Sequence, residues 1–260
     1  MAYNSLLFDK QGSITTITLN RPDVFNAFND EQSFELQDAL KAARKDDETR
    51  VLVLTGAGKA FCSGQDLKAI AGAEKRSFID SLNKRYNPII REMRNMPKPI
   101  ICRLNGVAAG AGCSLALASD FIIASENASL IEVFINVGLV LDSGSSFFLP
   151  RLVGSARAFE MSTMGSKISA KQAFEWGMVN RCVPAEQLDE ETKIVAEYYA
   201  NAPTKAIGLM KKMLNKSFNS SLETMLETET FSQEIAGSSA DNKEGVAAFN
   251  EKRKPNFTGK

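Results

Sequence analysis

The stretch that most constrains the fold runs from Asn105 to Asp120 and consists almost wholly of small residues. It follows an apolar run over residues 99–104 that is typical of a buried strand, and a helical pattern begins at Ala111. The glycines within it carry no side chain, so another backbone or a ligand can approach the turn closely. A strand that leads through glycines into a helix also presents free backbone N–H groups. The stretch therefore predicts either tight helix–strand packing or a binding site.

Short β-prone runs alternate with helical patterns in the first half of the chain, and the second half is mainly helical. Asn29 or Asp30 is placed to cap a first long helix, and Asp241 is placed to cap the last one. Residues 71–96 are expected to be largely helical, with an interruption near Pro88. This order predicts an α/β protein whose βαβ core is followed by a helical C-terminal module. The expected strands cover residues 6–8, 14–19, 50–55, 99–104 and 121–124.

The charged residues are balanced, and this argues against two classes of partner. The 260 residues include 31 lysines and arginines and 31 aspartates and glutamates, so the net charge is zero. Neither nucleic acid nor an anionic membrane surface is an expected partner of such a chain. No apolar run approaches the ~20 residues of a membrane-spanning helix, and the start of the sequence lacks a signal-peptide pattern. A cytoplasmic protein is therefore expected.

Histidine is absent from the whole sequence. This excludes Ser-His-Asp and Cys-His catalysis, and every zinc or iron site that depends on imidazole. The four cysteines lie far apart without CxxC spacing, so reduced thiols are expected rather than disulfides or a metal site. Acid–base chemistry in this chain must therefore come from carboxylates, amines, a tyrosine or a cofactor.

A second glycine turn, Cys62–Gln65, follows the expected strand at residues 50–55. In a parallel sheet, successive strand ends can lie side by side at the edge where ligands usually bind. The backbone N–H groups of Gln65 and Ala111 could then converge on one oxygen, as an oxyanion hole for charge that develops on a carbonyl. A phosphate cradle is the weaker interpretation, because neither turn matches GxGxxG or the Walker motif.

Six ordered segments, which together span nearly the whole chain, resemble the enoyl-CoA hydratase/isomerase (crotonase) superfamily. The most characteristic are LTGxGKAFCSGQDL at residues 54–67 and NGxAxGAG at residues 105–112. The other four segments cover residues 19–27, 149–154, 173–179 and 249–257.

The resemblance implies a spiral of ββα turns over residues 1–200 that binds an acyl-CoA thioester. It implies that residues 201–260 form a helical region that covers CoA and joins the chains into a homotrimer or a dimer of trimers. The thioester carbonyl would be held by the N–H groups of Gln65 and Ala111, the pair that the glycine turns indicate. No separate cofactor is expected, because coenzyme A is part of the substrate.

The acidic residues separate the subgroups of this family. By resemblance, hydratases carry glutamates at the positions of Ser114 and Phe134. Water addition needs a positioned water and a proton donor, so the absence of both glutamates argues against an efficient hydratase. Asp142 remains, in a Gly-Leu-x-x-Asp-x-Gly pattern that is similar to the ring-1,2-epoxyphenylacetyl-CoA isomerases, where the resemblance implies a proton shuttle. The alternative is that Asp142 only stabilises its loop as an Asx-type turn. The direction in which Glu132 faces is left open.

Further binding residues are implied by resemblance alone. They are Phe25 and Ala60 along the pantetheine or adenine path, Gln65, Asp66 and Leu67 at the second turn, and Lys252 near the CoA phosphates. Asp66 is also expected to order the turn after Gln65. The basic tail that begins at Lys252 has a second interpretation as an ordinary solvated charge run.

These observations predict an acyl-CoA isomerase that shifts a double bond or rearranges a ring epoxide through an enolate, with Asp142 as the single base and acid. Phenylacetate or fatty-acid catabolism is the expected setting. Two alternatives stay open, namely a low-activity enoyl-CoA hydratase and a non-catalytic acyl-CoA-binding scaffold subunit.

Overall fold

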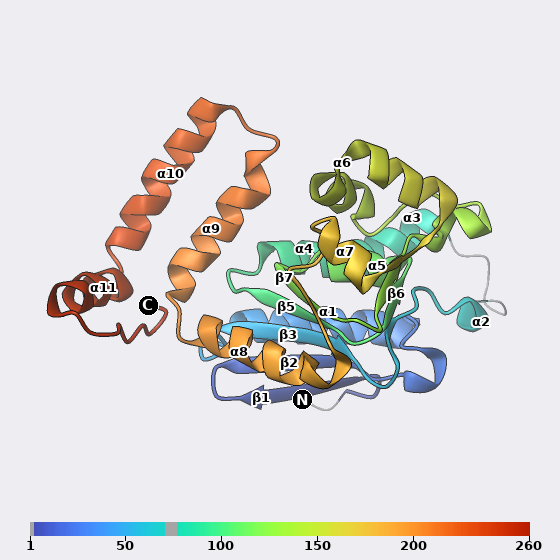
Figure 1. Ribbon diagram of the computed structural model, residues 1–260, viewed down its shortest axis with the longest axis horizontal. Helices are drawn as coiled ribbons and strands as arrows, with labels where there is room; N and C mark the ends of the chain where they lie inside the picture. Colours follow the sequence, from blue (N-terminus) through green and yellow to red (C-terminus); the bar gives the residue numbers. More distant parts are fainter. Residues whose placement is uncertain (1–2, 71–76) are drawn as a thin grey trace.

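The larger of two sheets begins with an antiparallel hairpin and continues with parallel strands. The computed structural model describes residues 3–70 and 77–260 (Figure 1). The order in this sheet is β1-β2-β3-β5-β7-β10, and every residue of β3 is buried, as expected of a strand covered on both faces. The strands are β1 (Leu6–Gln11), β2 (Ile14–Leu19), β3 (Val51–Gly56), β5 (Ile100–Leu104), β7 (Phe121–Ser125) and β10 (Arg181–Val183).

A smaller sheet with the order β4-β6-β8-β9 carries the glycine turns. From β3 to β8 the chain gives one strand to each sheet in turn, which produces the repeated ββα turns expected of this fold class. The strands of the smaller sheet are three residues long, and the sequence does not predict them, because three small residues are too few to show a hydrophobic period. The strands β9 and β10 likewise interrupt the half that was expected to be helical. The smaller sheet consists of β4 (Ala60–Cys62), β6 (Val107–Ala109), β8 (Ser129–Ile131) and β9 (Lys167–Ser169).

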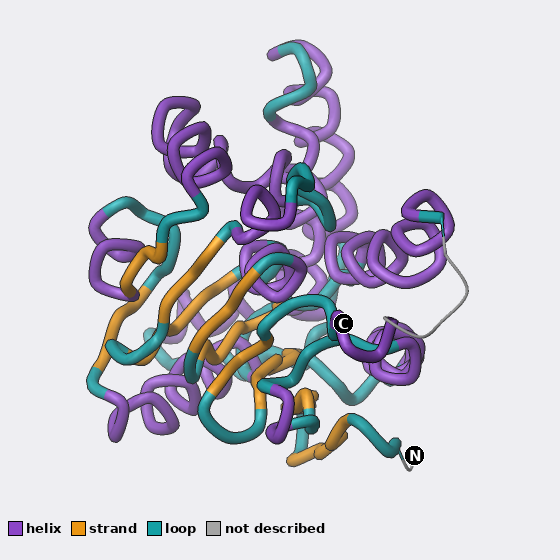
Figure 2. Tube along the Cα trace, turned by 90° about the vertical axis from the view of Figure 1, so that its right-hand side faces the viewer, coloured by secondary structure: helices purple, strands orange, loops and turns teal. Residues whose placement is uncertain are grey.

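Helices surround the two sheets, and Figure 2 shows the strands grouped together between them. The first helix begins where predicted, because the side chain of Asn29 accepts a hydrogen bond from the N–H of Gln32 at 2.9 Å. Every residue of α5 is buried, so this short helix forms the centre of the core. The helices of this part are α1 (Asp30–Lys45), α4 (Asn87–Asn95), α5 (Ala111–Leu117), α6 (Ser145–Met164), α7 (Ala170–Glu175) and α8 (Leu188–Ala200).

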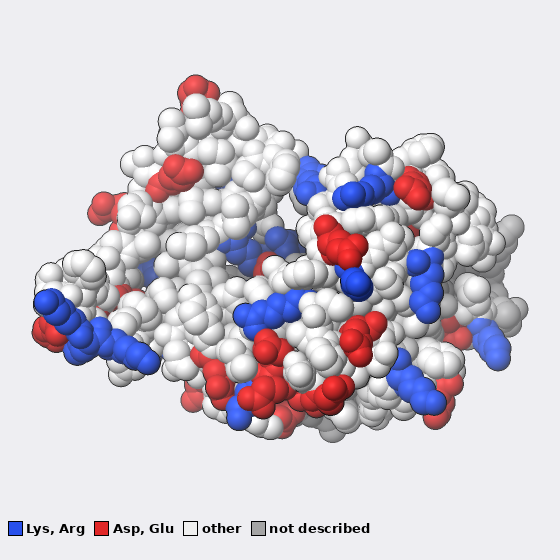
Figure 3. All heavy atoms as spheres, viewed as in Figure 1, with Lys and Arg blue, Asp and Glu red and all other residues white. Residues whose placement is uncertain are grey.

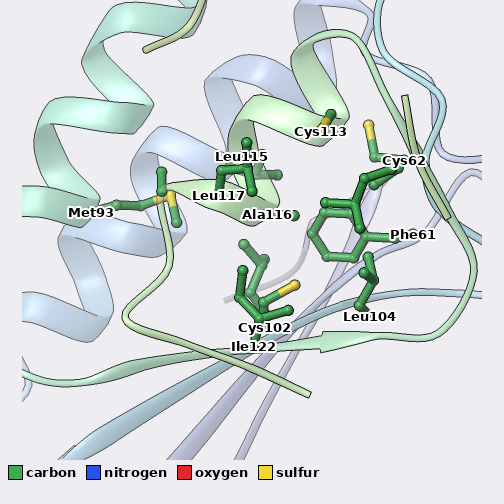
Figure 4. Close-up of a cluster of buried hydrophobic side chains, with 14 of the residues drawn as sticks. Phe61, Cys62, Met93, Cys102, Leu104, Cys113, Leu115, Ala116, Leu117 and Ile122 are labelled. Carbon is green, nitrogen blue, oxygen red and sulfur yellow. The ribbon is translucent and has the colours of Figure 1, made fainter. Parts of the chain in front are cut away.

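The core around α5 is apolar and contains three of the cysteines. Figure 4 shows Cys113 and Leu115 of α5 facing Phe61 and Cys62 of β4. All four cysteines are free thiols, and burial raises the pKa of Cys62 to about 12, so that thiol stays protonated. Within residues 3–70 and 77–260, no group of three or more acidic or cysteine side chains could hold a metal ion. No helix among these residues combines the length and hydropathy needed to cross a bilayer.

The region expected to be helical over residues 71–96 is described from residue 77 onward, and residues 71–76 lie outside the described part. After α2 (Leu67–Ile70), the chain forms α3 (Phe78–Ser81), a π-helical turn (Leu82–Tyr86) and α4. The predicted interruption is this wider turn, which ends two residues before Pro88. Proline has no N–H for a helical hydrogen bond, so a change of helix type is favourable there.

Three helices at the end of the chain form an arm that extends from the core in Figure 1. They are α9 (Thr204–Ser217), α10 (Leu222–Gly237) and α11 (Ala240–Glu251). Lys211 of α9 is buried and forms an ion pair with Asp120 at 2.6 Å, which ties the start of the arm to the core. By contrast, no residue of α10 is buried.

The predicted cap of the last helix is wrong. Ser239 caps α11, because its hydroxyl accepts from the N–H of Asn242 at 3.0 Å. Asp241 is already inside the helix, and its carboxylate accepts from the N–H groups of Thr258 and Gly259 at 2.6 and 2.8 Å. Serine and aspartate are both good N-caps, so the sequence does not decide between them. In the structure, the C-terminal segment folds back and forms hydrogen bonds with the carboxylate of Asp241.

Candidate active site

The two glycine turns meet backbone to backbone at the ends of β4 and β6, which are parallel neighbours. A Cβ atom on Gly112 would lie 2.1 Å from the carbonyl oxygen of Cys62, and one on Gly64 would lie 2.8 Å from that of Ala109. Gly64 also has a φ of +95°, which other residues rarely adopt. Only glycines therefore allow the two turns to come this close.

The backbone N–H groups of Gln65 and Ala111 are left free by the local structure. Phe28 donates its N–H to the carbonyl of Gly64 at 2.7 Å and accepts from the N–H of Asp66 at 2.9 Å. This parallel bridge uses both neighbours of Gln65, so the N–H of Gln65 points the other way. Ala111 begins α5, and the first N–H groups of a helix have no partner within it. Among the described residues, neither N–H donates to a backbone carbonyl.

A small, mainly apolar cavity lies at Ala111, which is one of its lining residues. The amide of Gln65 is held near it, since its Nε2 donates to the carbonyl of Phe28 at 3.0 Å and the hydroxyl of Tyr86 donates to its Oε1. The rings of Phe28 and Tyr86 pack edge to face with their centroids 5.7 Å apart. Burial and the charge of Asp142 raise the pKa of Tyr86, which therefore remains a neutral donor. The lining residues are Phe28, Tyr86, Ile89, Ile90, Ala111, Leu115 and Ser143.

Asp142 lies in the loop before α6, next to Ser143 of the cavity lining. Its side chain is half-buried and accepts a hydrogen bond from the hydroxyl of Ser143 at 2.7 Å. Burial raises the pKa of this carboxyl above its usual value. In the described part of the chain, no loop N–H donates to the carboxylate, and the N–H of Ser145 bonds instead to the main-chain carbonyl of Asp142 at 3.0 Å. The carboxylate thus bonds to the side chain of Ser143 rather than to a loop N–H, as an Asx-type turn would require.

A second carboxyl is buried behind α5. Glu132 is fully buried, and its Oε1 accepts from the hydroxyl of Ser145 at 2.9 Å. That hydroxyl is bonded to the hydroxyl of Ser114 at 2.7 Å, which in turn lies 3.1 Å from the main-chain oxygen of Asp142. Burial raises the pKa of Glu132 to about 7, although the hydrogen bond from Ser145 and the neighbouring thiol of Cys113 favour its charged form. In the sequence, Glu132 is one acid in an apolar run, and no local pattern shows that it faces inward.

The residues assigned to CoA binding by resemblance are only partly brought together. Phe25 and Leu67 are 56% and 59% exposed, and the main-chain carbonyl of Phe25 accepts from the N–H of Ser63 in the second turn at 3.0 Å. Ala60 is instead buried in β4, away from solvent. The side chain of Ala60 is therefore not exposed to a ligand, and Ala60 could affect CoA binding only by positioning neighbouring residues.

Asp66 orders the second turn. It forms an ion pair with Arg21 at 3.0 Å and accepts from the N–H of Ala69 at 3.1 Å. Burial alone would raise the pKa of Asp66, but these bonds hold it below its usual value. Lys252 ends α11, which lies at the opposite end of the molecule from α2 in Figure 1. A single chain therefore does not bring Lys252 to the turns.

Known proteins resemble this chain over nearly its whole length. The family model for enoyl-CoA hydratase/isomerase matches residues 9–260. The chain is 43% identical over 258 residues to the 1,2-epoxyphenylacetyl-CoA isomerase of Escherichia coli (strain K12), with 98% of each chain covered. It is 39% identical over 260 residues to a probable enoyl-CoA hydratase of Rhodobacter capsulatus, with both chains covered completely. The crystal structure of an enoyl-CoA hydratase from Bacillus anthracis is 34% identical in sequence and matches this structure with a TM-score of 0.94. The match covers 99% of this chain and 100% of the hydratase chain. The chain therefore belongs to the enoyl-CoA hydratase/isomerase family.

Proposed function

We propose that this protein is an acyl-CoA isomerase that shifts a double bond or rearranges a ring epoxide through an enolate, in phenylacetate or fatty-acid catabolism. Family membership supports the coarser statement that it is an enoyl-CoA hydratase or isomerase. The finer statement depends on one observation. The carboxyl of Asp142 accepts a hydrogen bond from Ser143 of the cavity lining, whereas the two positions that resemblance assigns to hydratase glutamates hold Ser114 and Phe134. The 43% identity to a 1,2-epoxyphenylacetyl-CoA isomerase supports the same choice.

The proposed oxyanion hole consists of the N–H groups of Gln65 and Ala111. A thioester carbonyl that accepts from both has more acidic protons at its α-carbon and at the vinylogous γ-carbon, because the enolate oxygen formed on proton loss is bound more tightly than the neutral carbonyl. One such donor contributes roughly 3–4 kcal/mol to lowering the barrier in related acyl-group chemistry. Both donors lie on turns that approach backbone to backbone, since a Cβ atom on Gly64 or Gly112 would meet a main-chain oxygen of the other turn.

Asp142 is suited to move one proton twice. As a carboxylate it takes the proton from the carbon beside the thioester carbonyl, and the acid so formed returns it to the far carbon of the conjugated system. Substrate and product then have the same composition. Burial raises the pKa of Asp142 toward neutrality, where a general base and acid works best. The hydroxyl of Ser143, 2.7 Å away, orients the carboxyl.

Water addition needs groups that this cavity does not present. A hydratase must hold a water for attack on one carbon and deliver a proton to the next. The hydroxyl of Ser114 is bonded to that of Ser145 and carries no charge, and Phe134 is apolar and only 7% exposed. Asp142 alone would have to serve as both groups at once. Isomerisation, which needs one base, is therefore favoured.

We also propose how the rest of the chain contributes. Residues 1–200 would be the acyl-CoA-binding core, and residues 201–260 would join the chains into a homotrimer or a dimer of trimers. Lys252 of one chain would then contact the CoA phosphates bound by another, because its own turns lie at the other end of the molecule. Phe25 and Leu67, both exposed beside the second turn, would contact the pantetheine or adenine. Coenzyme A enters as part of the substrate and no further cofactor takes part.

The function is tested by incubating the protein with a 3-enoyl-CoA, a 2-enoyl-CoA and the ring epoxide of phenylacetyl-CoA. Wild type should isomerise the first or the last, and Asp142→Asn should lower kcat by about 10²–10⁴, the usual contribution of general acid–base catalysis. Asparagine keeps the volume and can still accept from Ser143, but it cannot take up a proton. Asp47→Asn changes an exposed aspartate before β3 in the same way and serves as the matched control.

Three outcomes would contradict the proposal. Isomerisation at the wild-type rate by Asp142→Asn would remove Asp142 as the base. Hydration of the 2-enoyl-CoA faster than any isomerisation would favour the hydratase. Tight binding of all three thioesters without turnover would favour the scaffold subunit.

A further inference from the structure

The buried carboxyl of Glu132 has no part in the proton transfer described above, yet it is linked to the base. Glu132 is fully buried, and its Oε2 has no hydrogen-bond partner in the described part of the chain. Its Oε1 accepts from Ser145 at 2.9 Å, and the hydroxyls of Ser145 and Ser114 are 2.7 Å apart. The hydroxyl of Ser114 lies 3.1 Å from the main-chain oxygen of Asp142. One continuous row of polar atoms therefore joins Glu132 to the backbone of the base.

The direction of the hydrogen bonds in this row depends on the charge of Glu132, because each serine hydroxyl has one hydrogen to donate. A protonated Glu132 donates to Ser145, Ser145 donates to Ser114, and Ser114 is left to donate to the carbonyls of Asp142 and Gly110, which lie 3.1 and 3.2 Å from its hydroxyl. A carboxylate accepts from Ser145 instead, and Ser145 then draws the hydrogen of Ser114 toward itself. The carbonyl of Asp142 loses the side-chain bond only in the second case.

We propose that Glu132 is a positioning residue for Asp142, which in its protonated form holds the main chain of Asp142 in place through the hydroxyls of Ser145 and Ser114. The inference rests on the proposed role of Asp142 as the base. Ionisation of Glu132 releases the loop at Asp142 and turns its carboxyl away from the cavity. Ser114, at a position where resemblance assigns a glutamate to hydratases, thus provides a hydroxyl through which the protonation state of the deeper carboxyl of Glu132 affects Asp142.

The surroundings of Glu132 place this change within a usable pH range. The titratable groups that face it from the described elements are Cys113 of α5 and Asp142 of the loop before α6, and the first turn of α6 contributes the hydroxyl of Ser145. Burial of Cys113 raises the pKa of its thiol well above 9.0, so it stays neutral. Burial, with a smaller effect from the charge of Asp142, raises the pKa of Glu132 to about 7. At pH 8, one unit above this pKa, Glu132 is protonated in about a tenth of the molecules.

The test is the pH profile of kcat for isomerisation of a 3-enoyl-CoA, compared with Glu132→Gln. The glutamine amide can donate to Ser145 at every pH, so this variant imitates the protonated acid. Wild-type kcat should fall roughly fivefold between pH 7 and pH 8, as the protonated fraction of Glu132 drops from about one half to about one tenth, and the kcat of Glu132→Gln should not decline over this range. Ser114→Ala cuts the row and should lower kcat at all pH values without an alkaline decline. Glu234→Gln makes the same chemical change on the exposed face of α10 and should keep the wild-type profile.

A second readout works whether or not the protein turns over a thioester. A raised carboxyl pKa means that the protonated form stabilises the fold at low pH and that this stability is lost as the pH rises through about 7. The Tm of wild type should therefore fall relative to that of Glu132→Gln between pH 5 and pH 8. Parallel Tm curves, or an unchanged alkaline decline of kcat in Glu132→Gln, would overturn the positioning role. Absence of isomerisation in wild type would overturn only the proposed function.

Discussion

The core around α5 and the C-terminal arm use polar and apolar residues in opposite ways. All residues of α5 are buried, and even the carboxyl of Glu132 is enclosed beside it. In the arm, no residue of α10 is buried, and Leu222 and Phe231 are 69% and 63% exposed. In Figure 3 the visible face of α10 is mostly white, with a few acidic side chains. The core is thus complete within one chain, whereas the arm keeps an apolar surface of the kind that marks an interaction site.

The two regions also differ in where their backbones approach closely. In the core, a Cβ atom on Gly64 or Gly112 would meet a main-chain oxygen of the facing turn. The arm comes this close to the core in α9, where a Cβ atom on Gly208 would lie 2.6 Å from the carbonyl oxygen of Pro97, and it is also attached through side chains such as the ion pair of Lys211 with Asp120. Substitutions in the core should therefore lower stability and activity together, and those in the arm should mainly change attachment or assembly.

The largest stability effect is expected for Gly112→Ala. A Cβ atom at this position would lie 2.1 Å from the carbonyl oxygen of Cys62, so the two turns must separate. We expect a loss of about 3 kcal/mol or more in the free energy of unfolding, measured with urea, because overpacking against backbone cannot relax easily. Gly237→Ala in the arm is the matched control, since nothing lies within 4 Å of its Cβ position. Equal unfolding free energies of the two variants would contradict the contact between the turns.

A smaller effect is expected for Lys211→Met, which removes the attachment of α9. Lys211 is 7% exposed and donates to Asp120 at 2.6 Å and to the carbonyl of Lys98 at 3.2 Å. Asp120 would keep its ion pair with Arg94, so we expect a loss of about 2 kcal/mol. Amide hydrogen exchange should become faster in α9 and stay unchanged in β3. Lys212→Met, on the exposed side of α9, is the control, and equal exchange in both variants would argue against this attachment.

The smallest stability effect is expected for Phe231→Ser in α10. Its ring is 63% exposed in a single chain, so the unfolding free energy of an isolated chain should change by about 0.5 kcal/mol or less. If the arms join chains as proposed, the molar mass measured by light scattering should fall toward that of one chain. Glu229→Ser replaces an exposed acid on the same helix and should leave the mass unchanged. An unchanged mass for Phe231→Ser would remove α10 from the interface.

Local patterns predicted those parts of the fold that depend on neighbouring residues. The start of α1 at Asn29 and the strands β2, β3, β5 and β7 agree with expectation to within a residue or two, because each strand is an apolar run bounded by turn residues. The strands β4, β6 and β8 could not be found, since three residues are too few for a period. Asp241 was wrongly chosen as a cap, because its partners Thr258 and Gly259 lie far along the chain.

For the site, the sequence by itself determined which chemistry is possible. The absence of histidine limits proton transfer to other groups, and the spacing of the glycines indicates two turns with free N–H groups at Gln65 and Ala111. Only the tertiary structure decided which side chains meet. It turns Glu132 inward, places the carboxylate of Asp142 against the hydroxyl of Ser143 in the cavity lining and keeps Lys252 at the far end of the molecule. The physical reason is that the packing of helices and sheets decides which way a side chain points and how far apart two distant residues lie. The local sequence determines only the turns, caps and strands that are packed together.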